Sequence, residues 1–176
     1  MLLNKIPALD KGYVAYVSSS NSNKLLKELA LEFLKSHDIS SLQDFGTLTL
    51  VIKCPLFIQL NLSKFNLNII SAVSTDLEAY IPNPGEIGST DRQINETISD
   101  DINRTSEALL INPRAYQADG CDRFVSQIVT PINTYTTLIV HGSYKEWQRF
   151  CIQNSPPVPL VSYTVAVKQI LDMEWR

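Results

Sequence analysis

The chain has 176 residues, of which 44% are hydrophobic and 19% are charged, and its formal net charge is −3 at pH 7. These values are typical of a globular protein with a sizeable core, so we expect a single domain over residues 1–176. The acidic balance argues against a nucleic-acid-binding protein, because contacts to phosphates normally require a basic surface. No apolar run in the sequence approaches the roughly 18 residues that a membrane-spanning helix needs, so we predict no membrane association.

The cysteines and histidines favour a reducing compartment and no metal site. Cys54, Cys121 and Cys151 are odd in number, widely spaced and without a C-x-x-C pair, which indicates free thiols. The N-terminal segment lacks the apolar core of a signal peptide, so we predict a cytoplasmic protein. His37 and His141 are too isolated to complete a zinc cluster with these cysteines.

The first half of the chain predicts two strands and two helices. Residues 12–18 alternate as a strand does, and residues 23–36 carry the apolar stripe of a core-facing helix. Residues 47–52 are β-branched and apolar, which predicts a buried strand. Pro55 is suited to the first position of a helix, where its missing N–H has no cost. The side chains that we expect on the apolar face of this helix are Leu56, Phe57 and Leu60.

The middle of the chain predicts a loop followed by a helix. Residues 83–89 are rich in proline and glycine and indicate a loop. Thr90 and Gln93 have the spacing of a capping box at the start of a helix. The apolar positions of that helix are Ile94, Ile98 and Ile102, and its charged residues indicate a solvated face. Pro113 predicts that the helix is broken near residue 112.

The last third of the chain predicts three helices around one strand. A helix capped by Asp122 should end near Pro131, and residues 134–141 strongly favour a strand. A second capping box, from Ser143 to Glu146, opens a helix that turns Trp147 and Phe150 inward. A final amphipathic helix is expected to contact the core through Val161, Val165 and Ile170.

This order of segments resembles the flavin-dependent thymidylate synthases, the ThyX family. Lys53-Cys54-Pro55 matches the turn that ends the family's central strand, and Tyr80-Ile81-Pro82 matches the segment that closes its signature. Ile128-Val129-Thr130-Pro131 and Tyr135-Thr136 stand in the places of a later helix and strand. The resemblance implies an α+β, ThyX-like fold in which a mainly antiparallel sheet packs with helices. It also implies a homotetramer with sites between subunits.

The signature that defines the activity of the family departs from its pattern here. The family's Arg-His-Arg falls on Lys64, Phe65 and Asn66, and the arginine of a later helix falls on Gln127. The last arginine of the signature falls on Asp76, which reverses the charge. In the family these arginines bind the phosphates of FAD and dUMP, and each such charged hydrogen bond is worth roughly 1.5–3 kcal/mol. The sequence therefore predicts no catalytic residues and a loss of the flavin cofactor.

Five residues are candidates for a remaining nucleotide site: Lys64, Asn66, Ser74, Gln127 and Arg149. Ser74 stands where the resemblance implies a serine close to the uracil, although an ordinary loop serine is the more common explanation. Lys64 keeps a positive charge without the planar fork of an arginine, and Asn66 and Gln127 can donate hydrogen bonds but leave the charge of a phosphate uncompensated. Arg149 is also explained as a solvent-exposed residue of its helix.

Three functions follow from these observations. The first is an inactive or repurposed relative that acts as an oligomeric nucleotide-binding or assembly protein, with a pyrimidine nucleotide or an active paralogue as partner. The second is a working FAD-dependent thymidylate synthase, which methylates dUMP to dTMP, with a phosphate site rebuilt around Lys64, Asn66, Arg123 and Arg149. The third is a purely structural oligomer. The resemblance implies a homo-oligomer, a tetramer, and the apolar side chains of residues 56–70 also favour oligomerisation.

Overall fold

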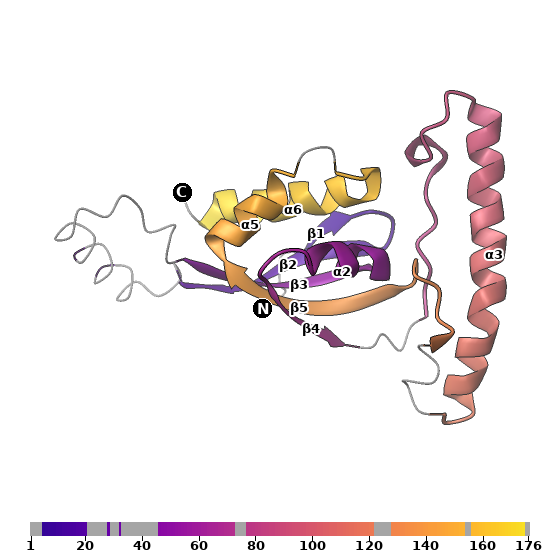
Figure 1. Cartoon of the computed structure of the whole chain (residues 1–176), viewed down its shortest axis with the longest axis horizontal. Coiled ribbons are helices and arrows are strands. Elements are labelled where there is room, and N and C mark those ends of the chain that lie inside the picture. The colour runs from indigo at the N-terminus through magenta and orange to yellow at the C-terminus, as the bar shows by residue number, and fades with distance from the viewer. Residues whose placement is uncertain are drawn as a thin grey trace.

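The computed structural model of the chain has an α+β fold, and the described residues contain one five-stranded antiparallel sheet that packs against helices (Figure 1). The expected fold class, α+β with a mainly antiparallel sheet, is confirmed at this level. The structure describes residues 5–20, 28, 32, 46–72, 77–121, 128–153 and 156–174. Of the expected helix over residues 23–36, it describes only Glu28 and Glu32, and both are helical.

The sheet is built around one long central strand, β3. In spatial order, the strands are β1 (Lys5–Ala8), β2 (Gly12–Ser19), β3 (Thr47–Pro55), β5 (Tyr135–Ser143) and β4 (Asn68–Ala72). Leu48, Leu50, Ile52 and Cys54 are buried at alternate positions of β3, because a strand places every second side chain on the same face. The strands expected over residues 12–18, 47–52 and 134–141 are confirmed, whereas β1 and β4 were not expected.

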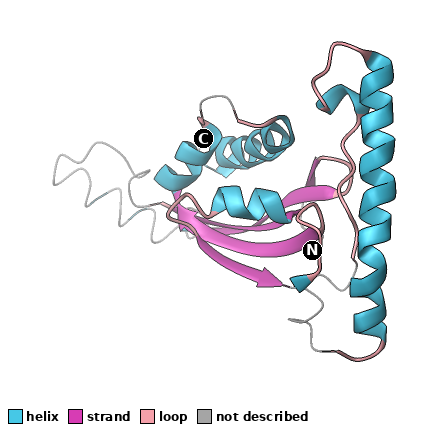
Figure 2. Ribbon diagram, turned by 45° about the vertical axis from the view of Figure 1, so that its right-hand side comes forward, coloured by secondary structure: helices cyan, strands magenta, loops and turns pink. Residues whose placement is uncertain are grey.

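Three helices cover one face of the sheet (Figure 2). They are α2 (Leu56–Leu62), α5 (Tyr144–Cys151) and α6 (Val158–Glu174). The core between the helices and the sheet contains Trp147, Phe150 and Tyr163, all at most 1% exposed, packed with Leu50 and Leu138. No described helix covers the opposite face of the sheet, where Ile70 is 67% and Ile139 is 46% exposed.

The helix α2 buries a different face from the one expected. Pro55 keeps an extended backbone as the last residue of β3 and caps the helix, so that the helix itself begins at Leu56. Ile58 and Leu62, four residues apart, are each 1% exposed, whereas Leu60 is 58% exposed. The expected apolar face was therefore wrong for Leu60, because the direction in which the chain leaves β3 turns positions 58 and 62 toward the core.

The helix α3 (Arg92–Ala118) is 27 residues long and stands apart from the other helices at one end of the sheet (Figure 1). It is attached through residues 77–83, which we call the strap. Leu110 is fully buried and packs with Leu77 and Ala79 of the strap. The Ser99 hydroxyl donates a hydrogen bond to the carbonyl of Pro82 at 2.7 Å.

Both ends of α3 differ from the sequence prediction. The helix begins at Arg92, and its cap is Asp91, whose carboxylate accepts hydrogen bonds from the backbone N–H groups of Gln93 and Ile94. It also continues through Pro113 to Ala118, so the predicted break was wrong. Pro113 has no backbone N–H, so the helix lacks one hydrogen bond there. The ring of Pro113 is buried, and this burial offsets part of the stability that the missing hydrogen bond costs. A short 3₁₀ turn, η3 (Pro84–Glu86), precedes the helix.

Among the described helices, none is both long and apolar enough to cross a membrane.

Candidate functional site

The structure brings two of the five predicted nucleotide-binding residues together, at the start of α5. Ser143 caps this helix by accepting a hydrogen bond from the N–H of Glu146. The carboxylate of Glu146 accepts one hydrogen bond from Arg149 Nη1 at 2.9 Å and another from the backbone N–H of Asn66 at 3.3 Å. Lys64 is exposed, two residues before Asn66.

Glu146 occupies the groups that a phosphate would use. The hydrogen bond from Arg149 lowers the pKa of Glu146, and the N–H of Asn66 and the charge of Lys145 act in the same direction. Burial opposes this change and raises the pKa. Because the carboxylate stays ionised at neutral pH, it neutralises Arg149 and repels an incoming phosphate. Arg149 is also 64% exposed, which weakens any single ion pair that it makes.

Phe65, at the position of the family's histidine, belongs to the core. Its ring lies edge-on to that of Phe150, with 5.6 Å between the ring centroids. It therefore contributes packing and offers no polar group to a ligand.

The remaining predicted residues, Ser74 and Gln127, lie outside the described residues, as do Asp76 and Arg123. The structure gives no geometry for them.

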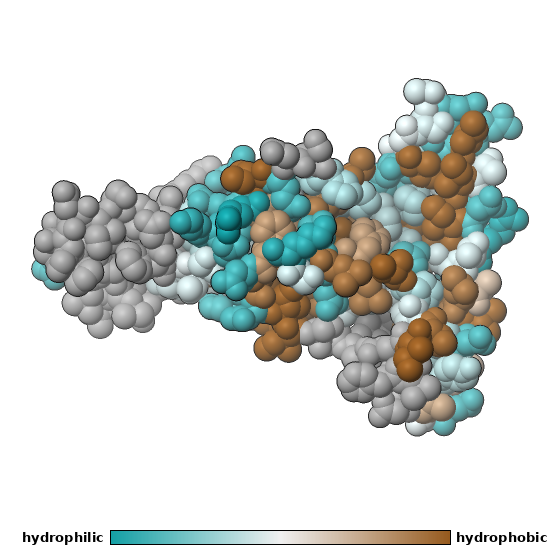
Figure 3. All heavy atoms as spheres, viewed as in Figure 1, coloured by the Kyte–Doolittle hydropathy of each residue, from teal (hydrophilic) through white to brown (hydrophobic). Residues whose placement is uncertain are grey.

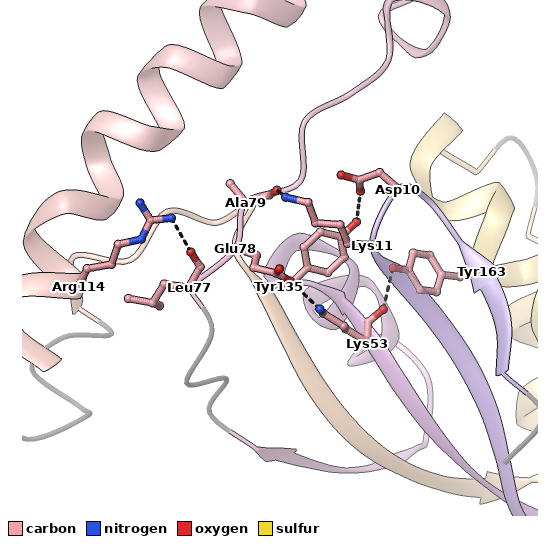
Figure 4. Close-up of polar contacts among 9 residues, drawn as sticks. All are labelled: Asp10, Lys11, Lys53, Leu77, Glu78, Ala79, Arg114, Tyr135 and Tyr163. Atoms are coloured by element: carbon pink, nitrogen blue, oxygen red, sulfur yellow. Dashed lines mark hydrogen bonds and ion pairs between the residues drawn. The ribbon is translucent and has the colours of Figure 1, made fainter. Parts of the chain in front are cut away.

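A second polar cluster, which the sequence did not predict, joins the strap to the end of the sheet (Figure 4). We call it the polar latch, and it consists of Asp10, Lys11, Lys53, Glu78 and Tyr135. Lys53 Nζ lies 2.6 Å from Glu78 Oε2 and 5.5 Å from the centre of the Tyr135 ring. The Tyr135 hydroxyl donates a hydrogen bond to Asp10, and Lys11 Nζ donates to the carbonyl of Ala79 at 3.3 Å.

The charges of the latch are matched within it. The hydrogen bond from Lys53 lowers the pKa of Glu78 against the effect of burial, and the positive charges of Lys53 and Lys11 lower it further. Burial, followed by the bond to Asp10, raises the pKa of Tyr135 and keeps its phenol protonated. The latch thus contains two carboxylates and two ammonium groups, and a protonated phenol remains a hydrogen-bond donor. This arrangement fixes the strap to the sheet.

Two further bonds tie the latch to its surroundings. The Tyr163 hydroxyl of α6 donates to the backbone carbonyl of Lys53 at 2.9 Å, and Arg114 of α3 donates to the carbonyl of Leu77 at 2.9 Å (Figure 4). The strap is therefore held from the sheet on one side and from α3 on the other. One feature of the sequence points to the latch, a lysine just before β2 and another near the end of β3, the strand that pairs with it. Its partners are distant in sequence and carry no spacing pattern.

The cysteines and histidines of the described chain show no arrangement for catalysis or metal binding. All three cysteines are free. Burial raises the pKa of the Cys54 thiol and raises that of Cys151 to about 12, so both stay protonated and unreactive at neutral pH. His141 is exposed on the sheet, with its Nδ1 2.8 Å from the hydroxyl of Thr49. No group of metal-ligating side chains is found among the residues that the structure describes.

Neither a protein-family model nor a curated protein matches this chain. The resemblance to flavin-dependent thymidylate synthases therefore stays a prediction from the sequence.

Proposed function

We propose that this protein is a non-catalytic assembly protein that works as a homo-oligomer on a ThyX-like scaffold. The observation that carries the proposal is the set of large apolar side chains exposed along one side of α3, where Ile94, Ile98 and Leu109 are each between 37% and 52% exposed. Figure 3 shows apolar side chains gathered along this helix. Contiguous apolar surface on a folded chain typically marks an interface with another macromolecule.

The open face of the sheet supplies a second apolar surface. Ile70, Ile139 and Val51 are direct neighbours on three adjacent strands, so their side chains form a row across this face. Two different self-complementary surfaces are what a tetramer with D₂ symmetry uses, because each pairs with its own copy about a separate two-fold axis. The resemblance also implies a tetramer, which agrees with the presence of two apolar surfaces, one on α3 and one on the sheet.

We propose a non-catalytic protein because of the contacts at the start of α5. Glu146 already binds Arg149 and the backbone of Asn66, and Phe65 packs in the core where the family has an imidazole. FAD and dUMP both carry phosphates, and neither finds a free arginine fork in this position. We place the protein in a reducing compartment, the cytoplasm, because its three cysteines are free.

A second function, binding of a pyrimidine nucleotide, is favoured by one observation. Lys145 and Arg149 both act on the carboxylate of Glu146, which also accepts from the N–H of Asn66, and Lys64 lies two residues before Asn66. The ion pair that Glu146 forms is with Arg149. A nucleotide phosphate could bind here at low affinity without any flavin. The working FAD-dependent thymidylate synthase remains the alternative if this site also holds the cofactor.

Mass measurement and two ligand tests examine the proposal. Light scattering after gel filtration should give the mass of an oligomer, and a monomer at all concentrations would contradict the assembly function. The visible spectrum should lack a flavin band with or without added FAD, and a retained band would instead support the enzyme. For the second function, we expect dUMP to raise the melting temperature more in Glu146→Gln than in the wild type, since the substitution frees Arg149.

A further inference from the structure

One side of α3 carries uncharged residues at the spacing of a helix that pairs with another helix. Ile98, Ile102, Thr105, Leu109, Asn112 and Tyr116 are spaced alternately by four and three residues, and we call them the α3 stripe. This spacing keeps side chains on one line along a helix and is the seam of a coiled coil. The stripe contains no charged residue and, from Ile98 to Tyr116, spans roughly 27 Å at 1.5 Å per residue.

The stripe is not the face by which α3 joins its own chain. The buried positions of the helix are Asn95, Ser106, Leu110 and Pro113. The stripe lies beside them and is open, with Ile98 37%, Leu109 52% and Tyr116 38% exposed. Ile94 and Ile98 also line a shallow surface depression of about 300 Å³. Two of the three apolar positions named from the sequence, Ile94 and Ile98, are thus exposed rather than buried, and they have no packing partner among the described residues.

We propose that the α3 stripe binds the α3 stripe of a second copy of this chain, with the two helices antiparallel about a two-fold axis near Thr105. This inference rests on the proposed assembly function and names the surface that carries it. A second copy is the occupant that the charges of α3 favour.

Those charges are unequally divided along the helix. Residues 91–101 carry four carboxylates and one arginine, whereas residues 104–118 carry two arginines and one carboxylate. An antiparallel pair places the acidic half of each helix beside the basic half of the other, and it also opposes the two helix dipoles. A parallel pair would place the two acidic halves side by side. The antiparallel arrangement also brings Tyr116 of one copy level with Ile94 and its depression on the other.

Charge substitutions test the surface, and the same helix offers a matched control. Leu109→Glu and Ile98→Glu each place a carboxylate in the seam, and we expect the dissociation constant of the dimer to rise at least about tenfold. Ile111→Glu introduces the same charge on the same helix, where residue 111 is 63% exposed but lies outside the stripe. We expect this control to keep the wild-type mass. All three positions are exposed, so circular dichroism should show an unchanged fold.

Cross-linking tests the direction of the helices. A residue on a two-fold axis faces its own copy, so Thr105→Cys should form a disulfide-linked dimer, whereas Ile98→Cys should not, because a disulfide needs Cβ atoms about 4 Å apart. Both variants are made with Cys121→Ser, since Cys121 is the exposed native thiol. Cross-linking at both positions would indicate a parallel pair and overturn the proposed arrangement.

The outcomes separate this inference from the proposed function. A wild-type monomer would overturn both. A wild-type oligomer whose mass is unchanged by Leu109→Glu and Ile98→Glu would leave the assembly function standing and overturn the α3 pairing. Equal dissociation by Ile111→Glu would show a general effect of charge on α3 and would also overturn the pairing by the stripe.

Discussion

The carboxylate of Glu78 joins the strap to the sheet through Lys53, 2.6 Å away. The hydrogen bond from Lys53 lowers the pKa of Glu78 below its ordinary value of 4.5. The stabilisation from this pair is therefore complete above pH 4.5 and is lost as the pH falls through the lower pKa of the folded protein. The side chain of Glu78 is 39% exposed, so solvent screens the pair and limits its contribution.

We expect Glu78→Gln to lower the free energy of unfolding at neutral pH by about 0.5–1 kcal/mol. The difference from the wild type should shrink below pH 4.5, because protonation then removes the same charge from the wild type. Urea unfolding at several pH values measures both effects. Glu107→Gln, which removes the more exposed pair with Arg114, is the control and should change the stability less. A difference between Glu78→Gln and wild type that is constant from pH 7 to pH 3 would contradict this assignment.

The stability of helix α3 depends on the cap formed by Asp91, a residue that the sequence did not identify as the cap. Asp91 accepts hydrogen bonds from Gln93 N at 2.8 Å and Ile94 N at 3.3 Å, and its charge lies at the positive end of the helix dipole. We expect Asp91→Ala to cost about 1 kcal/mol of stability, as is usual for a lost N-cap. Asp91→Asn keeps an oxygen acceptor and should stay close to the wild type.

Thermal unfolding followed by circular dichroism at 222 nm measures the two substitutions of this cap. If alanine and asparagine were equally destabilising, the charge of Asp91 would matter and its hydrogen bonds would not. If neither substitution changed the melting temperature, the first turn of α3 would not contribute to the cooperative unfolding of the protein.

The elements themselves differ in how well the sequence predicts them. Strand β3 was predictable because alternate apolar side chains fill one face of the sheet. Strands β1 and β4 are short and contain Pro7 and Asn68, respectively, so neither has the composition that marks a strand. The helix α3 runs through Pro113, whose ring is buried, and such burial is a tertiary effect that a local rule on proline does not include.

The residues around Glu146 and those of the polar latch were also only partly predictable from the sequence. Asn66 was predicted as a ligand partner from the resemblance and Arg149 as a compensating charge, and both donate to Glu146 in the structure. Their shared partner, Glu146, was predicted only as part of a capping box, so its occupation of both groups was missed. The polar latch was missed entirely, because Asp10, Lys53, Glu78 and Tyr135 meet only after the sheet and the strap have assembled.

At the scale of the whole molecule, the exposed sheet face and the α3 stripe lie on different elements and have different shapes. The stripe is a narrow line on one helix, whereas Ile70 and Ile139 form part of a flat row across strands β4 and β5. If each surface pairs with its own copy, blocking one of them should leave a dimer held by the other. A tetramer is thus expected to dissociate in two separable ways.

We expect Ile139→Glu to reduce a four-chain assembly to two chains, because it places a charge in the middle of the sheet row, where residue 139 is 46% exposed in the single chain. Adding Leu109→Glu should then give a monomer, since it removes the second surface as well. Ile152→Glu, at a position that is 74% exposed and outside both surfaces, is the matched control and should keep the wild-type mass. Sedimentation equilibrium distinguishes one, two and four chains. A four-chain mass for Ile139→Glu would exclude the sheet face as an interface, and the second surface of the tetramer would then have to be sought elsewhere on the molecule.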